Sequence, residues 1–300
     1  MPEISIVILT RNSSRTIRQC LEALLPISNM IGEVVIVDGN SVDDTLKIVS
    51  EFAMKLPLVI LSDEGRGLGY ARDVGWRATS SPYIIMLDSD VIMEPQFVTD
   101  SLRIMENDER VGALSAKLRP KTEEKGWFAL FQVKNLAINL HLSEPTYPEP
   151  AVALHTGCTM FRREALERVG GFDHHFRLAK EDSDISFRLR KAGYLLSYLP
   201  IEVTHLERAR FWKTNFRYGR SYVHISKKHP DMSPLLTFKN AFLTASLIFP
   251  PLQLLVYLHY VRRYGEVQGL SFTERLVLPG FEVLRQAVRT AGMLYELLNR

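Results

Sequence analysis

The chain has 300 residues, of which 46% are hydrophobic and 24% charged, so it can bury a sizeable core, and wholesale disorder, collagen and a simple coiled coil are excluded. The formal net charge of +3 is too small to indicate nucleic-acid binding, and we expect no such partner. The two cysteines, Cys20 and Cys158, cannot build a disulfide framework, which fits a reducing compartment. The N-terminal segment shows no basic region or cleavage site of a secretory signal.

Apolar strand-like runs alternate with helix-like segments over the first part of the chain. The sequence predicts strands at 4–9, 34–37, 58–61 and 83–87, and helices at 16–25, 43–54 and 68–78. Continuous apolar strands separated by helices predict a parallel sheet that is covered on both faces. In such sheets ligands bind beyond the carboxyl ends of the strands, so we examine those ends first.

Polar residues follow each of the four predicted strands. The ends carry residues 10–12 (Thr-Arg-Asn), 38–41 (Asp-Gly-Asn-Ser), 63–65 (Asp-Glu-Gly) and 88–90 (Asp-Ser-Asp). Asp, Asn and Gly also cap helices and form turns, so any one of these ends has an ordinary structural explanation. Four such ends on one edge of a sheet would crowd carboxylates together, and a cation or a hydrogen-bonding ligand would offset their repulsion.

The second half of the chain is less regular. We expect a helix over 95–106 and a strand over 112–118, followed by an irregular stretch at 121–150 that suits a loop shaping a substrate pocket. Further predicted elements are an apolar strand with a basic end at 155–163, a short helix that ends at 170–173, a helix at 181–192, and strands at 194–199 and 202–205.

Asp88 and Asp90 are separated by one residue and follow an apolar run. Two carboxylates so spaced can reach one divalent cation, and Mg²⁺ and Mn²⁺ prefer oxygen ligands while keeping positions open for phosphate oxygens. Such a cation would neutralise a diphosphate and help it leave. The same spacing also forms ordinary turns, but its position at a strand end favours the metal site.

Two other side chains and one glycine-rich segment have alternative interpretations. Asp182 begins a predicted helix, where it either caps the helix or acts as a general base on a hydroxyl. His205 is either a structural residue or, near a carboxylate-bound cation, one more ligand. Segment 65–73 lacks the third glycine of a dinucleotide loop, so we interpret it as a tight turn that lets the next helix approach a ligand.

A series of short motifs occurs along residues 3–228. In order they are Thr-Arg-Asn at 10–12, Asp38 with Gly39 and Ser41, Gly-x-Gly-Tyr-Ala-Arg at 67–72, Asp-x-Asp at 88–90, Gly-x-x-x-x-Arg-Arg at 157–163, Gly-Gly-Phe-Asp at 170–173, Glu-Asp-x-Asp at 181–184 with Arg188, Gly193-Tyr194 and His205. This series resembles the family 2 glycosyltransferases with the GT-A fold. The resemblance implies an α/β, Rossmann-like, mainly parallel sheet flanked by helices, and inverting sugar transfer from a nucleotide-sugar. One departure is Asp73, where the family commonly has Asn.

The resemblance also implies roles for the residues at the strand ends. Asp90 and His205 would bind Mn²⁺ or Mg²⁺ on the diphosphate. Asp182 would deprotonate the acceptor hydroxyl, which attacks the anomeric carbon from the face opposite the leaving group. The donor would be a UDP- or GDP-sugar. The residues that we expect to contact it are Asp38, Arg72 and Asp88 at the nucleoside, with Thr10, Arg11 and Ser89 beside them.

Residues 208–228 contain seven Lys or Arg and no Asp or Glu. Positions 213, 217, 220, 224 and 227 step by four and three, which places them on one face of a helix. The helix either packs on the core by its aromatic side and exposes the basic side to solvent, or it contacts a diphosphate or anionic lipid. Glu181, Arg217 and Arg220 are candidate contacts to the diphosphate or the acceptor.

The C-terminal part contains a long uncharged stretch. Residues 240–261 carry no Asp, Glu, Lys or Arg, and as a helix they would span about 33 Å. Pro250 and Pro251 would break that helix, so we expect a kinked or re-entrant insertion or helices lying at the membrane interface. The alternative is a helical pair, with an amphipathic segment at 272–298, that packs on a dimer partner or on the catalytic domain.

These features predict a catalytic domain over 1–230 and a C-terminal helical, apolar appendage over 231–300 that associates with a membrane or dimerises. The predicted function is inverting, metal-dependent sugar transfer to a lipid-linked or glycan hydroxyl or phosphate at the cytoplasmic face of the cell membrane. One alternative is a haloacid-dehalogenase-like phosphohydrolase with Asp88 as nucleophile, because residues 87–92 nearly match that motif. Another is a non-catalytic carbohydrate-binding or scaffold protein with the same fold.

Overall fold

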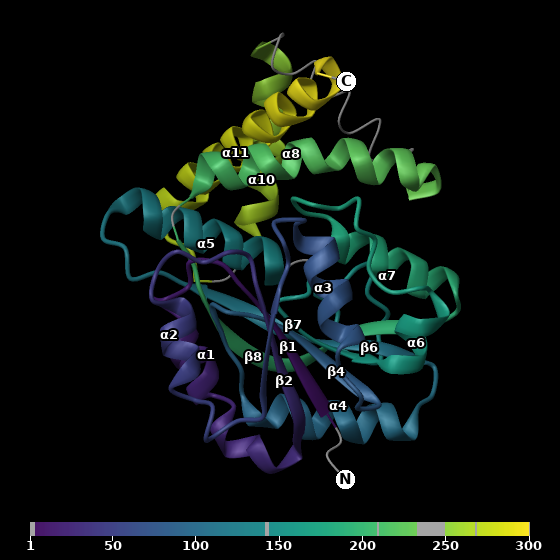
Figure 1. Ribbon diagram of the computed structural model, residues 1–300. Helices are drawn as coiled ribbons and strands as arrows, with labels where there is room; N and C mark the ends of the chain where they lie inside the picture. The colour runs from purple at the N-terminus through teal and green to yellow at the C-terminus, as the bar shows by residue number, and fades with distance from the viewer. Residues whose placement is uncertain (1–3, 142–143, 209, 233–249, 268, 300) are drawn as a thin grey trace. The chain divides into compact units, whose positions relative to one another are not determined.

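A computed structural model describes residues 4–141, 144–208, 210–232, 250–267 and 269–299 (Figure 1). Its contacts divide the chain into two compact units. The first comprises Met1–Lys121, Leu140–Arg177 and Glu181–Glu207, and the second Thr122–Asn139, Leu178–Lys180 and Arg208–Arg300. The expected domain boundary near residue 230 stays a prediction, and the structure groups the basic helix that precedes it with the second unit.

The first four strands form a parallel sheet, which confirms the predicted alternation. They are β1 (Ile4–Thr10), β2 (Ile31–Asp38), β3 (Leu58–Ser62) and β4 (Tyr83–Asp88), and they lie side by side in the order β3-β2-β1-β4. β1 and β2 are rich in β-branched residues, and β1, β2 and β4 are largely buried, which suits strands that helices cover on both faces; β3, at the edge of the sheet, is more exposed.

The sheet continues beyond β4 as a mixed sheet. The remaining strands are β5 (Val91–Ile92), β6 (Val111–Lys121), β7 (Cys158–Arg162) and β8 (Leu195–Leu206), in the order β7-β6-β8-β5 after β4. β7 is antiparallel to both β4 and β6, whereas β6 and β8 are parallel. The two strands expected at 194–199 and 202–205 form the single strand β8, and a register shift opposite Pro200 accommodates the missing N–H group.

Helices cover both faces of this sheet and bury alternate residues of its strands. On one face Ile6 and Ile8 share a core with Ile17 of α1 (Ile17–Glu22). On the other, Val7 shares a core with Trp76 of α3 (Leu68–Arg77). Side chains of a strand point alternately to the two faces, so one apolar run supplies both cores. The other helices of the first unit are α2 (Thr45–Ser50), α4 (Pro95–Asn107), α6 (Arg163–Arg168) and α7 (Glu181–Lys191), with a 3₁₀ turn at Leu25–Met30.

The stretch 121–150, expected to be an irregular loop, contains helix α5 (Trp127–His141), so that expectation is wrong in part. Apolar residues occur around the whole helix, and its sequence therefore lacks the period that marks an amphipathic helix. Its two phenylalanines pack on Phe281: the ring of Phe131 stacks on that of Phe281 at a centroid distance of 5.8 Å, and the ring of Phe128 lies 5.0 Å from that of Phe281, whereas Trp127 is largely exposed.

The second unit is helical. It contains α8 (Phe211–Lys228), a 3₁₀ turn at Pro230–Met232, α10 (Pro250–Gly265) and α11 (Phe272–Leu298), which confirms the helices expected at 213–227 and 272–298. Helices α8 and α11 cross closely (Figure 1), because Gly219 faces the backbone of Arg289 and Gly292 that of Phe216; a Cβ at either glycine would lie about 2 Å from a carbonyl oxygen.

The long uncharged stretch falls partly outside the described residues. Residues 240–249 are not described, and 250–261 belong to α10. Within the described part of the chain, every helix is too short or too polar to cross a bilayer. The surface of α10 nevertheless exposes three leucines, Leu254, Leu255 and Leu258, each at least half exposed.

Candidate active site

The register of the parallel strands places the predicted polar ends next to one another. Thr10 pairs with Asp38 on the neighbouring strand, and Asp88 pairs with the residue before Thr10. Asn12, Asn40 and Glu64, which follow the first three strands, each adopt a positive φ between 51° and 59°. Asparagine tolerates this left-handed conformation well, so two of these local sequences favour sharp turns that return the chain over the edge of the sheet.

Hydrogen bonds connect the turns that follow β1, β2 and β4. Both carboxylate oxygens of Asp38 bind Ser41, one accepting from its backbone N–H (2.8 Å) and the other from its hydroxyl (2.6 Å). The backbone N–H of Asn12 donates to the Ser41 hydroxyl (2.9 Å). The hydroxyls of Ser13 and Ser89 are 2.8 Å apart. These bonds order the edge on which the nucleotide-sugar residues were expected.

Two further predicted contacts lie on this edge with different surroundings. Arg11 is exposed, and its aliphatic stem packs within 3.2 Å of the position that a Cβ on Gly39 would occupy. Thr10 is 4% exposed, and its hydroxyl oxygen is buried without a hydrogen-bond partner among the described residues. A buried hydroxyl without a partner is uncommon and is often explained by an absent water or ligand.

Arg72 is the central cation of the edge. Its guanidinium donates to Asp88 (Nη2 to Oδ1, 2.9 Å), to Glu181 (Nε to Oε1, 3.2 Å) and to the Thr156 carbonyl (3.4 Å). The residue is 3% exposed, so these interactions act at low screening. The family resemblance predicts that Arg72 and Asp88 lie at the same nucleoside site. The structure adds Glu181 to the ion-pair network that they form.

Glu181 is buried beside a second carboxylate. Burial and the charge of Asp182 raise the pKa of Glu181 to about 7, although Arg72 opposes the rise. One oxygen, Oε2, has no hydrogen-bond partner among the described residues. Glu181 therefore lies buried at the start of α7. One of its carboxylate oxygens accepts from Arg72, and the other is able to accept a further hydrogen bond.

Asp90 and His205 form the second pair of predicted residues that the structure brings together. His205 Nε2 lies 3.4 Å from Asp90 Oδ1, because the short strand β5 pairs Val91 with His205. The other ring nitrogen lies 3.3 Å from Glu207 Oε1. Burial disfavours the imidazolium, but the hydrogen bond and charge of Asp90, with the charge of Glu207, raise the pKa of His205 to about 9. Glu207 is a member of this group that the sequence analysis missed.

Once His205 has released its ring proton, the donor set of Asp90 and His205 fits a divalent ion of the Mn²⁺ type, which accepts carboxylate oxygen and imidazole nitrogen. The Asp90 side chain is 40% exposed, so one of its oxygens is open to a ligand. Among the described residues no group of three or more His, Cys, Asp or Glu side chains is arranged around one metal position. An ion held by this pair would therefore take its remaining ligands from water or from a diphosphate.

Asp182 lies in the first turn of α7 and is half-buried. Its Oδ1 accepts hydrogen bonds from the backbone N–H (2.6 Å) and the hydroxyl (3.2 Å) of Ser183. Both alternatives that the sequence left open are compatible with this geometry, because a carboxylate at the start of a helix interacts favourably with the helix dipole and still presents an oxygen.

The loop before β7 contributes contacts that the sequence analysis missed. The carbonyl of Gly157 accepts from the backbone N–H of Asp88 (2.9 Å), and a Cβ at Gly157 would lie 3.4 Å from Asp88 Oδ2 and 3.2 Å from Leu118. A larger residue at 157 would therefore press on the Leu118 side chain. The signal in the sequence is a glycine directly before an apolar strand.

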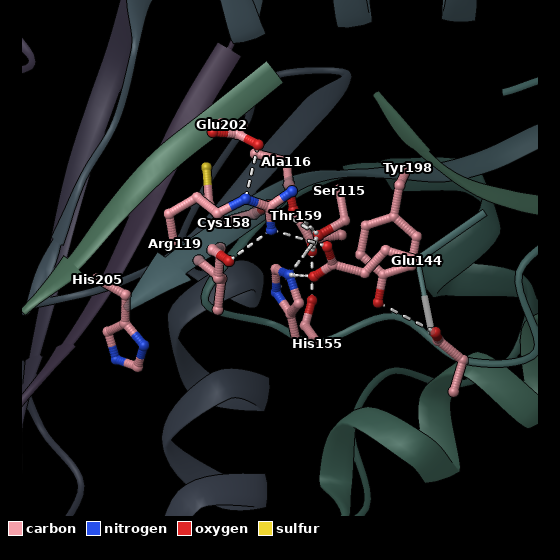
Figure 2. Close-up of polar contacts among 12 residues, drawn as sticks. Ser115, Ala116, Arg119, Glu144, His155, Cys158, Thr159, Tyr198, Glu202 and His205 are labelled. Atoms are coloured by element: carbon pink, nitrogen blue, oxygen red, sulfur yellow. Dashed lines mark hydrogen bonds and ion pairs between the residues drawn. The ribbon is translucent and has the colours of Figure 1, made fainter. Parts of the chain in front are cut away.

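A buried polar cluster supports this loop from behind. Figure 2 shows the ring of His155 beside Ser115 and Tyr198, whose ring centroid lies 5.5 Å away. Burial, and then the positive charges of His205 and Arg72, lower the pKa of His155 to about 3, so the ring is neutral. The Thr159 hydroxyl donates to the Ser115 hydroxyl (2.8 Å), and this bond links β7 to β6 next to the loop.

Arg119 lies at the rim of the same cluster (Figure 2). Its Nε donates to Glu202 (2.7 Å) and its Nη1 to Glu144 (3.1 Å). Burial raises the pKa of Glu144, and Arg119 opposes this rise. The side chain of Glu144 lies 3.9 Å from the His155 ring, so a buried acid and a neutral imidazole face each other behind the site.

The glycine-rich segment has a different explanation from the one expected. Gly67 and Gly69 do not face an open ligand position, because a Cβ at either residue would lie 2.6 Å or less from a backbone oxygen of the loop 173–177. The turn lets α3 approach that loop, and Leu68 and Gly69 donate backbone hydrogen bonds to it.

Asp73, the departure from the family pattern, holds the same loop. Its Oδ1 accepts from the Trp76 indole (2.8 Å) and the Phe172 backbone N–H (3.1 Å). Its Oδ2 lies 2.9 Å from both Arg77 Nε and His174 Nε2. An amide oxygen could serve the two buried donors, whereas the pair of outer partners explains a carboxylate here.

Arg217 and Arg220 belong to the second unit. Arg220 forms an ion pair with Glu296 of α11 (Nε to Oε2, 2.7 Å), and His224 lies 3.2 Å from the same carboxylate. The guanidinium of Arg217 lies 5.9 Å from the Tyr218 ring centroid. Part of the basic face therefore packs against α11, and a contact of these arginines with diphosphate or acceptor stays a prediction.

Comparison with known proteins identifies the class of protein. The family model described as glycosyl transferase family 2 matches residues 5–170, more than half of the chain. The chain belongs to this family, which confirms the resemblance and decides against the phosphohydrolase alternative.

Curated relatives and solved structures agree with this class. The chain is 26% identical over 240 residues to the probable glycosyltransferase YdaM of Bacillus subtilis (74% of this chain, 56% of YdaM). It is 25% identical over 211 residues to the O-antigen chain rhamnosyltransferase WbaN of Salmonella anatum (66% of this chain, 64% of WbaN). The chain thus spans between half and two thirds of the length of these relatives.

Among solved structures, the mannosyltransferase PcManGT of Pyrobaculum calidifontis, in complex with GDP-Man and Mn²⁺, has a TM-score of 0.66 at 19% identity, with 100% of this chain and 88% of that chain covered. TarS 1-349 of S. aureus in complex with UDP has a TM-score of 0.54 at 16% identity, with 99% and 92% covered. These similarities confirm the expected GT-A-type fold.

Proposed function

We propose that the protein transfers a sugar from a UDP- or GDP-sugar to an acceptor hydroxyl or phosphate with inversion at the anomeric carbon, in a divalent-metal-dependent reaction at a membrane surface. The single observation that carries the proposal is the pairing of Asp90 with His205 on the same sheet edge as the Arg72–Asp88 ion pair. A partly exposed aspartate beside a histidine suits the metal ion of a metal–diphosphate, and the buried Arg72 holds Asp88 in place on the same edge. The complexes of PcManGT and TarS with GDP-Man and UDP support the choice of donor class.

Asp90 and His205 would hold the cation, which neutralises the diphosphate and stabilises it as a leaving group. Asp38, Thr10, Arg11 and Ser89 lie on the edge that would bind the nucleotide. Arg72 would fix Asp88 and Glu181 relative to one another, so that the nucleotide edge and the start of α7 keep their spacing.

Asp182 would act as the general base. Its carboxylate takes the proton of the acceptor hydroxyl, the acceptor oxygen forms a bond to the anomeric carbon, and the bond from that carbon to the nucleoside diphosphate breaks. For a phosphate acceptor, which is already ionised near neutral pH, Asp182 has no proton to remove and its replacement should matter much less. Glu181, which Arg72 engages, would position the start of α7.

The direct test is release of UDP or GDP from a panel of nucleotide-sugars by the full chain, measured with Mn²⁺, with Mg²⁺ and after chelation. We expect release to need both a divalent ion and an acceptor preparation, and thermal stability to rise with one donor class in the presence of the ion. Full activity after chelation would contradict metal dependence. Stabilisation by a sugar without any turnover would favour the non-catalytic binding protein.

Membrane association is proposed from the surface of the second unit. Leu254, Leu255 and Leu258 of α10 are 57%, 57% and 50% exposed, and a helix with such a face can lie in the interface of a bilayer. Flotation of the full chain with phospholipid vesicles tests this, beside a Leu254→Gln/Leu258→Gln variant. We expect the variant to float less. If neither protein floats and the wild type alone is dimeric, the leucines form a subunit interface.

A further inference from the structure

The second unit contains a small cavity between helices α8, α10 and α11. Its volume is about 130 Å³, which is room for several water molecules or for one tetrahedral oxyanion. Every residue that lines it belongs to the second unit. The wall includes Arg263 of α10 and Arg285 and Arg289 of α11, with Glu282, Tyr222 and Thr290.

Positive charge exceeds negative charge in this wall. Three arginines face one carboxylate, and Glu282 is already engaged: its Oε1 accepts from Arg285 Nη2 (2.6 Å) and from the Gln286 amide (2.6 Å). Its Oε2 accepts weakly from Asn139 (3.5 Å). Glu282 carries a single negative charge, so it balances at most one of the three guanidinium groups of the wall.

The arginines retain unused hydrogen-bonding capacity. The side chain of Arg285 is 14% exposed, and its Nε is buried with no hydrogen-bond partner in the described part of the chain. Arg289 donates to the amide oxygen of Asn215 (3.0 Å) and lies 5.3 Å from the Tyr218 ring centroid. No carboxylate lies within ion-pair distance of Arg263 or Arg289 among the described residues.

Burial of these guanidinium groups beside one another carries an electrostatic cost. Burial, together with repulsion from Arg285, lowers the pKa of Arg289, which means that the surroundings disfavour its charged form. Arginine nevertheless stays protonated in proteins, so an anion from outside the chain would stabilise this charge. Phosphate suits this role, because its oxygens can accept from more than one guanidinium and the planar fork of arginine matches them in pairs.

We propose that the cavity lined by Arg263, Arg285 and Arg289 binds the phosphoryl group of a phosphate-bearing ligand. The proposal does not depend on sugar transfer at the sheet edge. The exposed leucines Leu254 and Leu258 lie on the helix that also supplies Arg263, so we expect the phosphoryl group to be that of a lipid and not free phosphate.

The test compares the full chain with Arg289→Gln in thermal unfolding, in chloride and in inorganic phosphate at equal ionic strength. Phosphate should raise the unfolding temperature of the wild type and of Arg262→Gln, an exposed arginine outside the cavity. It should raise that of Arg289→Gln far less, because loss of one charged donor weakens binding about 10- to 100-fold. In chloride, Arg289→Gln should be at least as stable as the wild type, since it removes an unbalanced buried charge.

Equal phosphate-induced shifts in the wild type and in Arg289→Gln would overturn the proposal. If that variant does not fold, Arg263→Gln decides in the same way, because Arg263 is only half-buried and has no carboxylate partner among the described residues. A binding experiment with vesicles distinguishes a lipid from free phosphate. Vesicles whose lipids have a phosphomonoester headgroup should retain the wild type and Arg262→Gln more than Arg289→Gln. Retention that is equal for all three, with a phosphate shift specific to the cavity, assigns it to free phosphate.

Discussion

The two units of the molecule treat buried charge in opposite ways. In the first unit Arg72 is flanked by Asp88 and Glu181, and Arg188 forms two bonds to the fully buried Asp184. In the second unit the cavity of α10 and α11 has more guanidinium groups than carboxylates. A buried ion pair orders the chain without a ligand, whereas buried charge of one sign is stabilised by a ligand of the other sign.

The same comparison separates the charged residues of the sheet edge into two groups: those already paired with another residue of the chain, and those exposed enough to bind a ligand. Arg72 and Glu181 are 3% and 4% exposed, and they hold loops together. The Asp90 and Asp88 side chains are 40% and 35% exposed and present oxygens outward. Substrate chemistry is therefore expected at the exposed acids, while replacement of the buried members should disturb the fold first.

The largest expected effect comes from Asp90→Ala. It should abolish metal-dependent binding of a nucleotide-sugar, because the ion loses its only open carboxylate on the Asp90–His205 pair, and it should leave the fold intact because Asp90 is partly exposed. Isothermal titration with Mn²⁺ and the donor measures this, and circular dichroism checks the fold. The matched control is Asp100→Ala, another partly exposed aspartate, on α4. Unchanged donor affinity in Asp90→Ala would refute the metal assignment.

Asp182→Asn should keep donor binding and lower turnover with a hydroxyl acceptor by about 10²–10⁴-fold, the usual contribution of a positioned general base. The amide still accepts the hydrogen bonds from Ser183, so the start of α7 should be preserved. Initial rates at saturating donor measure the effect, with Asp184→Asn as a control for loss of helix structure. A near wild-type rate in Asp182→Asn would place the base elsewhere.

The sheet edge could be predicted from the sequence because its determinants are local. Apolar runs of fixed period define β1 to β4, and the residues at their ends, such as Asp38 and Asp88, must then gather on one edge. The pairing of Arg72 with Glu181, which are 109 residues apart, depends on how α3 and α7 pack and has no local signal. Both residues are candidate site residues from the sequence, but no sequence feature indicates that they form an ion pair.

Other parts failed for identifiable physical reasons. Helix α5 was interpreted as a loop because its apolar residues lack a period, and only its packing on Phe281 explains them. Gly67 and Gly69 were interpreted as a ligand turn, because a close approach to protein backbone and one to a ligand demand the same residue. The cavity of the second unit was missed because Arg263, Arg285 and Arg289 have unremarkable spacing until α10 and α11 pack.

A smaller effect is expected from Asp73→Ala, which tests a carboxylate that is structural and not substrate-binding. The change leaves the Trp76 indole and the Phe172 N–H without their acceptor, and unsatisfied buried donors cost about 1–3 kcal/mol of unfolding free energy. Urea unfolding measures the loss. Asp73→Asn keeps one oxygen for both donors and should cost less than Asp73→Ala. Equal destabilisation by the two changes would show that the outer partners, Arg77 and His174, matter more.

The smallest expected effect concerns Glu274, at the start of α11 in the second unit. It forms a capping box with Ser271 and an ion pair with Lys134, and the hydrogen bond with Lys134, followed by those with Ser271, lowers the pKa of Glu274 to about 2. A carboxyl group whose pKa is lower in the folded than in the unfolded chain stabilises the fold above its unfolded pKa, near 4.5, and loses that contribution as the pH falls toward 2. Because the pair is partly exposed, the contribution should be about 1 kcal/mol or less. Glu274→Gln should therefore reduce stability at pH 7 and match the wild type near pH 2, as followed by thermal unfolding. A difference between the two proteins that stays constant over this pH range would assign the effect to loss of the helix cap and not to the charge of Glu274.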